Sequence, residues 1–220
     1  MSSVHLARPW LTFDLGGPVQ VLSWAINRPG FVTADRIVWR EVRNADLPRD
    51  MDVYSWLARE LRGNGQQDAI AFLTSRDVTY FVQETCTVED ATAHCVVTVG
   101  LSNAERVGHR VDHSATDWGT INIAVLLDRA LSQTGLIEML SIVAQARTLA
   151  VLEAEMLLPC GLATGTGTDC IAVAAPFGGA DYAGLHTSIG EAVGAAVYRA
   201  TRRGAGQWKT DVGPLLAARP

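Results

Sequence analysis

The sequence predicts an α+β fold, in which a mixed, largely antiparallel sheet packs against helices in a single domain. Strand patterns predominate in the first half of the chain and helices flank the later strands, which favours α+β over a regular α/β alternation. Hydrophobic residues make up 48% of the 220 and charged residues 19%, so there is enough apolar material for one core. We expect that domain to span residues 1–203 and the tail, residues 204–220, to dock loosely or fray.

Short apolar runs separated by turn residues locate the strands. They are expected at 19–26, 35–42, 69–75, 78–88, 93–101, 119–128 and 170–175. The fourth and fifth runs are joined by "EDAT" and are expected to form a hairpin. The run at 119–128 is too apolar for an exposed edge strand, so we expect it to lie inside the sheet.

Apolar residues at helical spacing and capping residues locate the helices. Helices are expected at 50–63, at about 135–158 and at about 189–202. Asp50 and Thr134 precede the first two as N-caps. Ser188 and Glu191 form an S-x-x-E capping box at the start of the third, which gives Glu191 a structural role without any catalysis.

Charge and hydropathy bear on partners and location. The net charge of −5 and the lack of a Lys/Arg cluster argue against a nucleic-acid-binding groove. The longest apolar stretch, Leu136 to Leu158, is interrupted by charged residues, so we expect it not to span a bilayer. The N-terminal "MSSVHLARPW" lacks the apolar core of a signal peptide. We therefore expect a cytoplasmic protein without nucleic-acid or membrane partners.

Three polar, glycine-bearing segments each adjoin an apolar strand, which suits a site at strand ends. In "VTVGLSNAERVG" (97–108), Ser102 and Asn103 could present a hydroxyl and an amide to a ligand. In "GTINIAVLL" (119–127), Asn122 lies within an apolar strand and must either fasten a neighbouring loop or face a pocket.

The third segment is "ATGTGTDCIAVAAP" (163–176). Gly165 and Gly167 allow positive φ and could turn backbone N–H groups towards an oxyanion or a phosphate. The segment lacks the spacing and the lysine of a P-loop, which argues against nucleoside triphosphates. Its plainer interpretation is a turn that leads into a buried strand.

A histidine and an aspartate close two of the glycine-bearing loops. Asp169 ends the loop before the 170–175 strand, and His186 in "YAGLHTSIGEAVGAAV" (182–197) precedes the last helix. Histidine is the side chain whose ordinary pKa lies nearest neutrality, so His186 is the candidate base and Asp169 a group that could orient it.

Four segments together resemble one known family. "TVGLSNA", "GTINIAVLL", "ATGTGTDCIAVA" and "YAGLHTSIGEAVGAAV", in this order from about Val96 to Val197, resemble the adenosylcobinamide amidohydrolase (CbiZ) family. "VLSWAINRPGF" and "DRIVWREV" resemble its N-terminal segment more weakly. The resemblance implies hydrolysis of the amide that joins aminopropanol to the corrin side chain of adenosylcobinamide, giving adenosylcobyric acid in corrinoid (cobalamin) salvage. The corrinoid, with its cobalt, would be a small-molecule substrate, and no separate cofactor is expected; a homo-oligomer is left open.

Amide hydrolysis requires a nucleophile, a base, donors for the oxyanion and an acid for the leaving amine. The expected catalytic residues are Asp169, His186 and Glu191. The expected substrate-binding residues are Ser102, Asn103, Asn122, Gly165, Thr166, Gly167, Thr168 and Trp118. The nucleophile is either an activated water or the side chain of Cys170, Ser102 or a loop threonine.

Cys170 departs from the family pattern, in which serine is common at that position, so an obligatory thiolate is not favoured. A metal-dependent mechanism is left open because Asp169, His186 and Glu191 are all of metal-ligand type, but no metal is expected, since no HExxH-like pair and no CxxC spacing is present. A flat corrin needs an apolar platform, for which Trp118 is the first candidate, followed by Trp24, Trp39 and Trp56. One alternative is a non-catalytic corrinoid-binding or tetrapyrrole-binding protein. Another is a phosphate-binding or nucleotide-binding protein, which the single lysine in the chain makes a weaker hypothesis.

Overall fold

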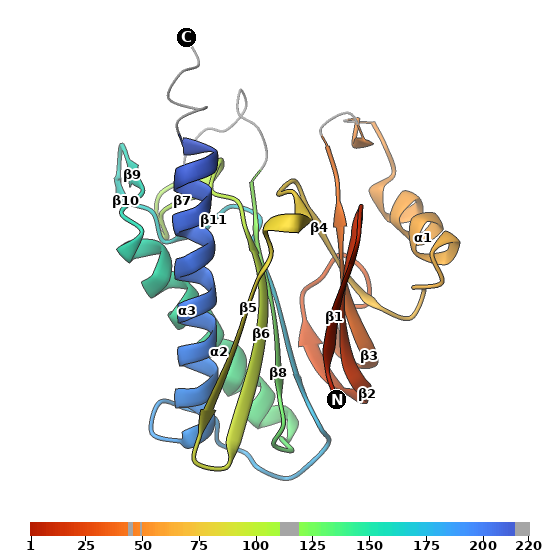
Figure 1. Cartoon of the computed structure of the whole chain (residues 1–220), viewed down its shortest axis with the longest axis vertical. Coiled ribbons are helices and arrows are strands. Elements are labelled where there is room, and N and C mark those ends of the chain that lie inside the picture. The colour runs from red at the N-terminus through yellow and green to blue at the C-terminus, as the bar shows by residue number, and fades with distance from the viewer. Residues whose placement is uncertain (44–45, 49, 111–118, 214–220) are drawn as a thin grey trace.

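The computed structural model describes residues 1–43, 46–48, 50–110 and 119–213, which form a mixed sheet and its covering helices (Figure 1). The strands are β1 (Ser3–Ala7), β2 (Trp10–Ser23), β3 (Gly30–Glu41), β4 (Ile70–Thr74), β5 (Val82–Val88), β6 (Ala91–Val99), β7 (Ala104–Glu105), β8 (Ile121–Leu127), β9 (Leu157–Leu158), β10 (Gly161–Leu162), β11 (Gly165–Thr166) and β12 (Cys170–Ala175). The helices are α1 (Val53–Gly63), α2 (Gln133–Glu153) and α3 (Ser188–Asp211), with a 3-10 turn, η2 (Val78–Tyr80).

The main sheet has the order β4-β3-β2-β12-β8-β6-β5, and β1 pairs with β2. β12 runs parallel to β8 and β3 runs parallel to β4, while the other pairs of this sheet are antiparallel. Two short ladders, β10-β9 and β11-β7, lie outside it. The predicted α+β class with a mixed, largely antiparallel sheet is therefore confirmed.

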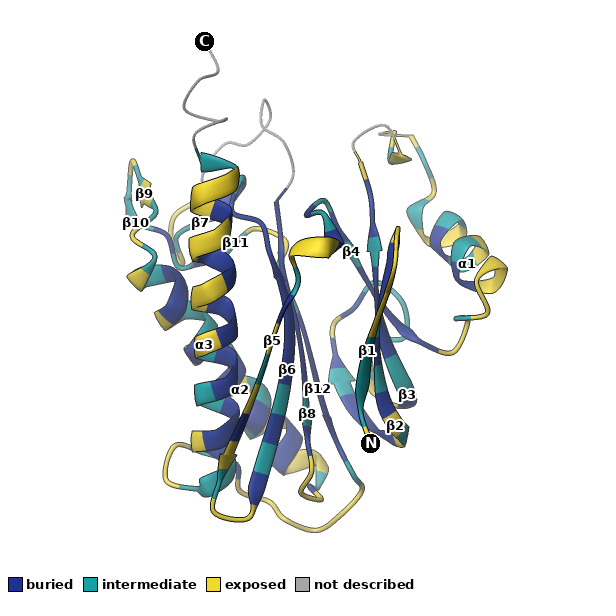
Figure 2. Ribbon diagram, in the orientation of Figure 1, coloured by how far each residue is buried: buried dark blue, intermediate teal, exposed yellow. Residues whose placement is uncertain are grey.

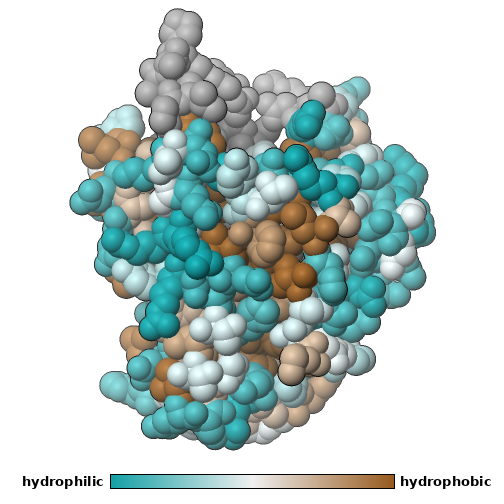
Figure 3. Space-filling model, in the orientation of Figure 1, coloured by the Kyte–Doolittle hydropathy of each residue, from teal (hydrophilic) through white to brown (hydrophobic). Residues whose placement is uncertain are grey.

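The sheet folds over so that its two halves face each other. We call β1 to β4 the first half and β12, β8, β6 and β5 the second half. One core cluster contains Leu11 and Phe13 of the first half together with Ala124 and Ala172 of the second. Figure 3 shows hydrophobic side chains gathered in the middle of one face, between these two halves.

Helices cover the outer side of each half, so the molecule has four layers (Figures 1 and 2). Leu57 and Leu61 of α1 pack with Val38 and Ala71 on the outside of the first half. α2 and α3 pack against each other and against β12, β6 and β5 on the outside of the second half. The buried faces of the helices in Figure 2 point towards the sheet, as the apolar pattern of a covering helix requires.

β12 has the predicted bounds, but β2 is longer than expected. Strand β2 begins at Trp10, whereas the sequence predicts a strand only from Val19. Gly16 and Gly17 have φ of +82° and +149°, and the β2–β3 register shifts between Asp14 and Val19. The turn-like "GGP" is thus a bulge within a continuous strand, which bends it without ending it.

Two predicted N-caps are wrong by two residues. Asp52, and not Asp50, caps α1 by accepting a hydrogen bond from Ser55 N at 3.1 Å. Ser132, and not Thr134, caps α2 by accepting one from Gly135 N at 3.2 Å. α2 also ends at Glu153 and not at residue 158, since Glu155 has a φ of +53° that a helix cannot contain.

The last helix is longer than predicted. α3 continues to Asp211, so the expectation that residues 204–220 form a loose tail is wrong for residues 204–211. Trp208 is buried, and a Cβ on Gly204 would lie 2.7 Å from Val99 Cγ2. The glycine that suggested a break instead lets α3 lie close to β6. Residues 214–220 lie outside the described part of the chain.

Among the described residues, one helix, α2, is long and apolar enough to cross a membrane by length and composition alone. We expected the charged residues between 136 and 158 to exclude a membrane span. By length and composition alone they do not. Residues of α2 such as Met139, Val143 and Ala150 are buried in the core that it shares with α3 and β12. The fold thus uses α2 as a packed core helix.

Candidate active site

Asp169 lies immediately before β12 and is the centre of a buried polar cluster. Its carboxylate accepts hydrogen bonds from Ile121 N and Thr166 N, both at 3.1 Å. It also accepts from the Thr166 hydroxyl and forms an ion pair with the Arg147 guanidinium of α2. The side chain is 8% exposed, so four donors replace the water that this charge loses on folding.

Burial raises the pKa of the Asp169 carboxyl above its ordinary value, and the Arg147 charge and the donors from Thr166 and Ile121 oppose that rise. The Arg147 side chain is 18% exposed, and its Nε has no partner among the described residues. Removing one partner of such a buried pair leaves an uncompensated charge, which typically costs about 3–5 kcal/mol. The pair therefore fixes the loop before β12 onto α2.

Gly165 is required for this contact. A Cβ built on it would overlap the Arg147 guanidinium and would lie 2.6 Å from Asp169 Oδ2. The β11–β7 ladder, which pairs Gly165 with Glu105, holds the loop on its other side. The glycine predicted to shape a ligand-binding loop thus makes room for a buried ion pair.

The three polar segments identified in the sequence meet at this edge of the sheet. Thr168 Oγ1 donates to Gly119 O at 2.9 Å and accepts from Asn103 Nδ2 at 3.3 Å. Thr120 Oγ1 donates to Thr168 O at 2.8 Å. Ser102 lies in the same cluster, since a Cβ on Gly119 would lie 2.6 Å from its backbone nitrogen. Backbone and hydroxyl groups therefore link the ends of β6, β8 and β12.

Several groups expected to bind the oxyanion are instead used within the loop. Thr166 N donates to Asp169, and Gly167 N donates to Asn103 O at 3.4 Å. Asn103 is buried, and its Nδ2 donates to Thr168. The sequence indicated that these donors exist but not which way they point, and the structure turns them inward.

Asn122 is buried and fastens the two halves of the sheet together. Its Nδ2 donates to Leu73 O of β4 at 2.8 Å, and its Oδ1 accepts from Thr120 Oγ1 at 3.4 Å. Of the two roles left open by the sequence, the structure therefore supports the fastening role.

His186 and Glu191 lie at the opposite end of β12 from Asp169. β12 has six residues, which separates the two loops by about 20 Å. His186 is exposed, and Glu191 lies in the first turn of α3. Thr187, and not Ser188, caps that helix, accepting from Gly190 N at 2.9 Å. The structure does not bring His186 and Asp169 together, because one precedes the strand and the other follows it.

Cys170, the first residue of β12, has a neutral thiol at physiological pH. Burial raises its pKa to about 12, the nearby Asp169 charge adds to the rise, and the Ser23 hydroxyl opposes it. A thiol of this kind is a poor nucleophile unless a base removes its proton. The structure therefore supplies a physical reason for not favouring an obligatory thiolate.

Trp24 is the described tryptophan that reaches this site. Its Nε1 donates to Asp169 O at 2.9 Å, and the residue remains 48% exposed. Trp39 is fully buried, and Trp56 packs at the edge of the α1 core. Trp118, the first candidate for a platform from the sequence, lies outside the described residues.

Two site residues were not singled out from the sequence. Arg147 looked like an ordinary interruption of an apolar helix. It lies on the same face of α2 as the buried Val143 and Val151, where a charge signals a buried partner. Glu105 lies beside the exposed Gly167, where a Cβ would be 3.7 Å from Glu105 Cγ and 4.0 Å from its Oε1. Within the described ranges, no three His, Cys, Asp or Glu side chains are grouped so as to hold a metal ion.

The comparisons assign the chain to the hydrolases that act on carbon–nitrogen amide bonds. More particularly, it belongs to the adenosylcobinamide amidohydrolase family, CbiZ, whose model matches residues 2–212 of the 220. The family predicted from the four sequence segments is therefore confirmed, and with it an adenosylcobinamide amidohydrolase function. No curated protein matches the chain.

Three solved structures show a slight similarity. The PH0078 protein from Pyrococcus horikoshii OT3 is 10% identical (TM-score 0.44; 89% of this chain and 76% of that chain covered). A β-aminopeptidase from Burkholderia sp. is 13% identical (TM-score 0.43; 89% and 78% covered). An l-aminopeptidase d-ala-esterase/amidase from Ochrobactrum anthropi, described as a variant of the ntn hydrolase fold, is 12% identical (TM-score 0.41; 92% and 81% covered). At these scores none of them assigns a residue's role in this chain.

Proposed function

We propose that the start of β12 is where this protein hydrolyses the aminopropanol amide of adenosylcobinamide, releasing adenosylcobyric acid and 1-aminopropan-2-ol. The observation that supports this location is the convergence of three family-like segments around the buried Asp169–Arg147 pair. A buried ion pair beside exposed loop residues is a costly feature that a merely structural turn does not need. The corrinoid brings its own cobalt, and the protein itself is proposed to need no cofactor.

The reaction adds one water across the amide. The water oxygen bonds to the carbonyl carbon, the carbon–nitrogen bond breaks, and the leaving nitrogen takes up a proton. Glu105 is our candidate for the group that accepts the proton from water and returns it to the amine, because its side chain lies beside the exposed Gly167. His186 and Glu191 lie beyond the far end of β12, about one strand length from this loop. The proposal therefore gives them no part in the proton transfer.

Asp169 acts as a positioning residue in this proposal. Its two carboxylate oxygens already accept from four donors, which is about as many as a carboxylate can accommodate. It therefore has little capacity left to take a proton from water. Its role is to hold Thr166 and the start of β8 in fixed positions beside Thr168.

Trp24 is proposed as part of the platform for the corrin. The ring system is broad and flat, and the exposed face of an indole offers a large apolar contact at little cost in conformational entropy. The hydrogen bond to Asp169 O fixes the indole at the strand start. The substrate would thus rest on a group that is itself tied to the reaction site.

The proposal is tested by incubating the purified protein with adenosylcobinamide and measuring released aminopropanol by mass spectrometry. Corrinoid binding is measured in parallel from the absorbance change of the corrin. Stoichiometric release above the spontaneous rate is expected. Tight binding without release would instead support the non-catalytic corrinoid-binding alternative.

The location and assembly of the protein are also proposals. We propose a cytoplasmic protein without nucleic-acid or membrane partners, and the net charge of −5 argues against a nucleic-acid partner. Cell fractionation tests the location, and light scattering tests whether the protein is a homo-oligomer.

A further inference from the structure

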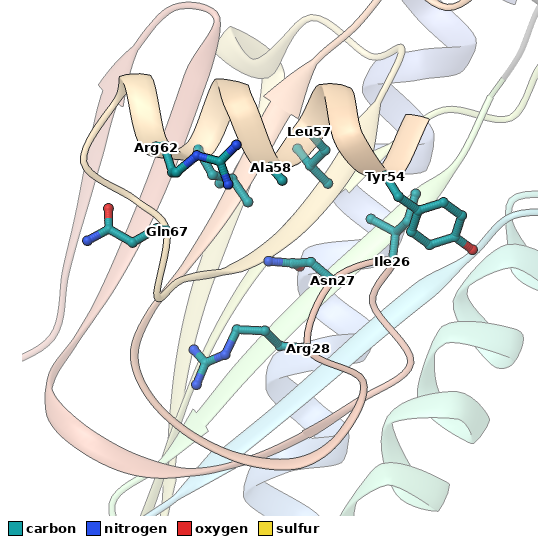
Figure 4. A pocket seen from close by; sticks show the side chains of 9 residues that line it. Ile26, Asn27, Arg28, Tyr54, Leu57, Ala58, Arg62 and Gln67 are labelled. Atoms are coloured by element: carbon teal, nitrogen blue, oxygen red, sulfur yellow. The ribbon is translucent and has the colours of Figure 1, made fainter. Parts of the chain in front are cut away.

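A cavity of about 190 Å³ lies between α1 and the loop that joins β2 to β3. Figure 4 shows Tyr54, Leu57 and Ala58 on the α1 side of it, and Ile26 and Asn27 on the loop below. It lies outside the cluster around Asp169, and neither the family match nor the proposed reaction uses it.

The loop wall of this cavity is held firmly. Asn27 Nδ2 donates to Ala69 O at 2.9 Å, and Asn27 Oδ1 accepts from Ala71 N at 2.7 Å. Arg28 donates to Thr33 O at 2.9 Å and also to Asp68 O. Since these bonds fasten the loop to β3, to β4 and to the residues just before β4, the cavity is formed before any ligand arrives, which lowers the entropic cost of binding.

The lining of the cavity suits one flat heteroaromatic ring system. Leu57 and Leu61 form an almost fully buried apolar wall on the α1 side, while Arg62 and Gln67 lie at the exposed rim. Tyr54 is 70% exposed and presents an aromatic ring at one end. The volume is below the roughly 300–1,000 Å³ of sites that enclose drug-sized ligands, so a corrin cannot enter.

The cavity lies close to the proposed reaction site, because residues close together in the chain contribute to both. Ile26 follows Trp24 by two residues, which places their Cα atoms within about 7 Å of each other. Trp24 in turn bonds Asp169 O. A corrinoid resting on Trp24 with its side-chain amide at the start of β12 would therefore carry its upper axial group close to this cavity.

We propose that the cavity is the subsite for the adenine of the substrate's adenosyl group; this inference rests on the proposed function. The ring would stack on Tyr54 and contact the apolar wall of α1. Arg62 can donate to a ring nitrogen, and Gln67 can accept from the exocyclic amine. Selectivity for the adenosylated corrinoid then comes from a pocket on the first half of the sheet, while the amide is cleaved at the second half.

The test compares binding of adenosylcobinamide and cyanocobinamide, which lacks the adenosyl group, to the wild type and three variants. The wild type is expected to bind adenosylcobinamide at least about tenfold more tightly, about 1.4 kcal/mol. Ala58→Leu fills the cavity, and Tyr54→Ala removes the aromatic end from an exposed position. Both are expected to bring the ratio of the two dissociation constants close to one without weakening cyanocobinamide. Arg59→Leu, an exposed change on the same helix outside the cavity, is expected to keep the wild-type ratio.

The outcomes separate this inference from the proposed function. If folded Ala58→Leu and Tyr54→Ala keep the wild-type ratio, or if the wild type shows no preference, the adenine subsite is wrong even when aminopropanol is released. A preference that both variants abolish supports the subsite even if no aminopropanol is released, in which case the proposed hydrolytic function fails and the subsite stands. Competition by free 5′-deoxyadenosine against adenosylcobinamide, but not against cyanocobinamide, supports the subsite independently.

Discussion

The two ends of β12 carry loops of similar composition and entirely different structure. The loop before the strand surrounds a buried carboxylate with four donors and an arginine from α2. The loop after the strand leaves His186 exposed and is used to start helices. Both are rich in glycine and polar residues, so composition alone does not distinguish them. What distinguishes them is buried charge, which a fold keeps only where something offsets its cost.

The polar groups of the second loop have structural tasks. Ala183 N donates to Glu138 Oε2 at 2.7 Å, and the Thr187 hydroxyl donates to Gly184 O at 2.8 Å. A Cβ on Gly190 would overlap the backbone around Gly184, so the glycine there permits close packing of the loop on α3. The loop after β12 therefore packs against the starts of α2 and α3. The comparison of the two loops predicts that catalysis depends on the loop before β12.

Glu105→Gln is expected to have the largest effect. If Glu105 transfers the proton, kcat should fall by about 10²–10⁴-fold, because the amide cannot accept a proton from water. The rate of aminopropanol release from saturating adenosylcobinamide measures this, while corrinoid binding should change little.

Glu89→Gln is the matched control for that change. Glu89 is exposed in the turn between β5 and β6, away from the loops that meet before β12, and its variant should keep the wild-type rate. A Glu105→Gln protein that retains more than half of the wild-type kcat would remove Glu105 from the mechanism.

Arg147→Ala is expected to have the next largest effect. Leaving Asp169 buried without its guanidinium should lower the free energy of unfolding by about 3–5 kcal/mol, measured by urea denaturation. The control is Arg129→Ala, whose ion pair with Asp90 is exposed and should contribute only about 0–1 kcal/mol.

A double variant sharpens the interpretation of that loss. Arg147→Met with Asp169→Leu removes both charges, so much of the stability should return, because an apolar pair can replace a buried ion pair. Activity should remain low, since Thr166 and Ile121 lose the carboxylate that holds them. Full recovery of activity would show that the pair has no positioning role.

Cys170→Ala is expected to have a small effect. With the thiol pKa raised to about 12, only about one thiol in 10⁴ is ionised at pH 8, so alkylation of the folded protein by iodoacetamide should be slow. If water is the nucleophile, Cys170→Ala and Cys170→Ser should both keep more than about a third of the wild-type kcat.

The two cysteine variants together test whether the side chain at position 170 is the nucleophile. Loss of activity in folded Cys170→Ala with retention in Cys170→Ser would show that a side-chain thiol or hydroxyl attacks the amide. Loss in both would point to the thiol itself. Either result would overturn the water mechanism, while the location of the site at the start of β12 would stand.

Much of the fold could be predicted because strands and helices leave periodic patterns, and two of the errors in element length arose at glycines. Strand β2 begins before the predicted position 19 and bulges at Gly16, and α3 continues through Gly204, which lies in close contact with Val99. A glycine marks an unusual backbone or a close approach equally well, and the sequence does not say which.

The site could be predicted only in part. The segments 97–108, 119–122 and 163–169 meet because they adjoin the end of β6 and the starts of β8 and β12, which are neighbouring strands. The partner of Asp169 depends on how α2 is placed against the loop, which no local pattern encodes. His186 seemed to accompany Asp169 because both end glycine-bearing loops, but those loops lie at opposite ends of β12.

His186→Ala is expected to have the smallest effect and tests the comparison most directly. The side chain is exposed and lies about one strand length from Asp169, so its loss should change kcat less than twofold and the free energy of unfolding by less than about 0.5 kcal/mol. Aminopropanol release and urea denaturation are measured side by side with those of Arg147→Ala. A loss of more than about a hundredfold in the rate, with unchanged stability, would show that the end of β12 takes part in catalysis. The prediction that catalysis depends only on the loop before β12 would then be wrong, because an exposed histidine can affect the rate that strongly only by reaching the substrate.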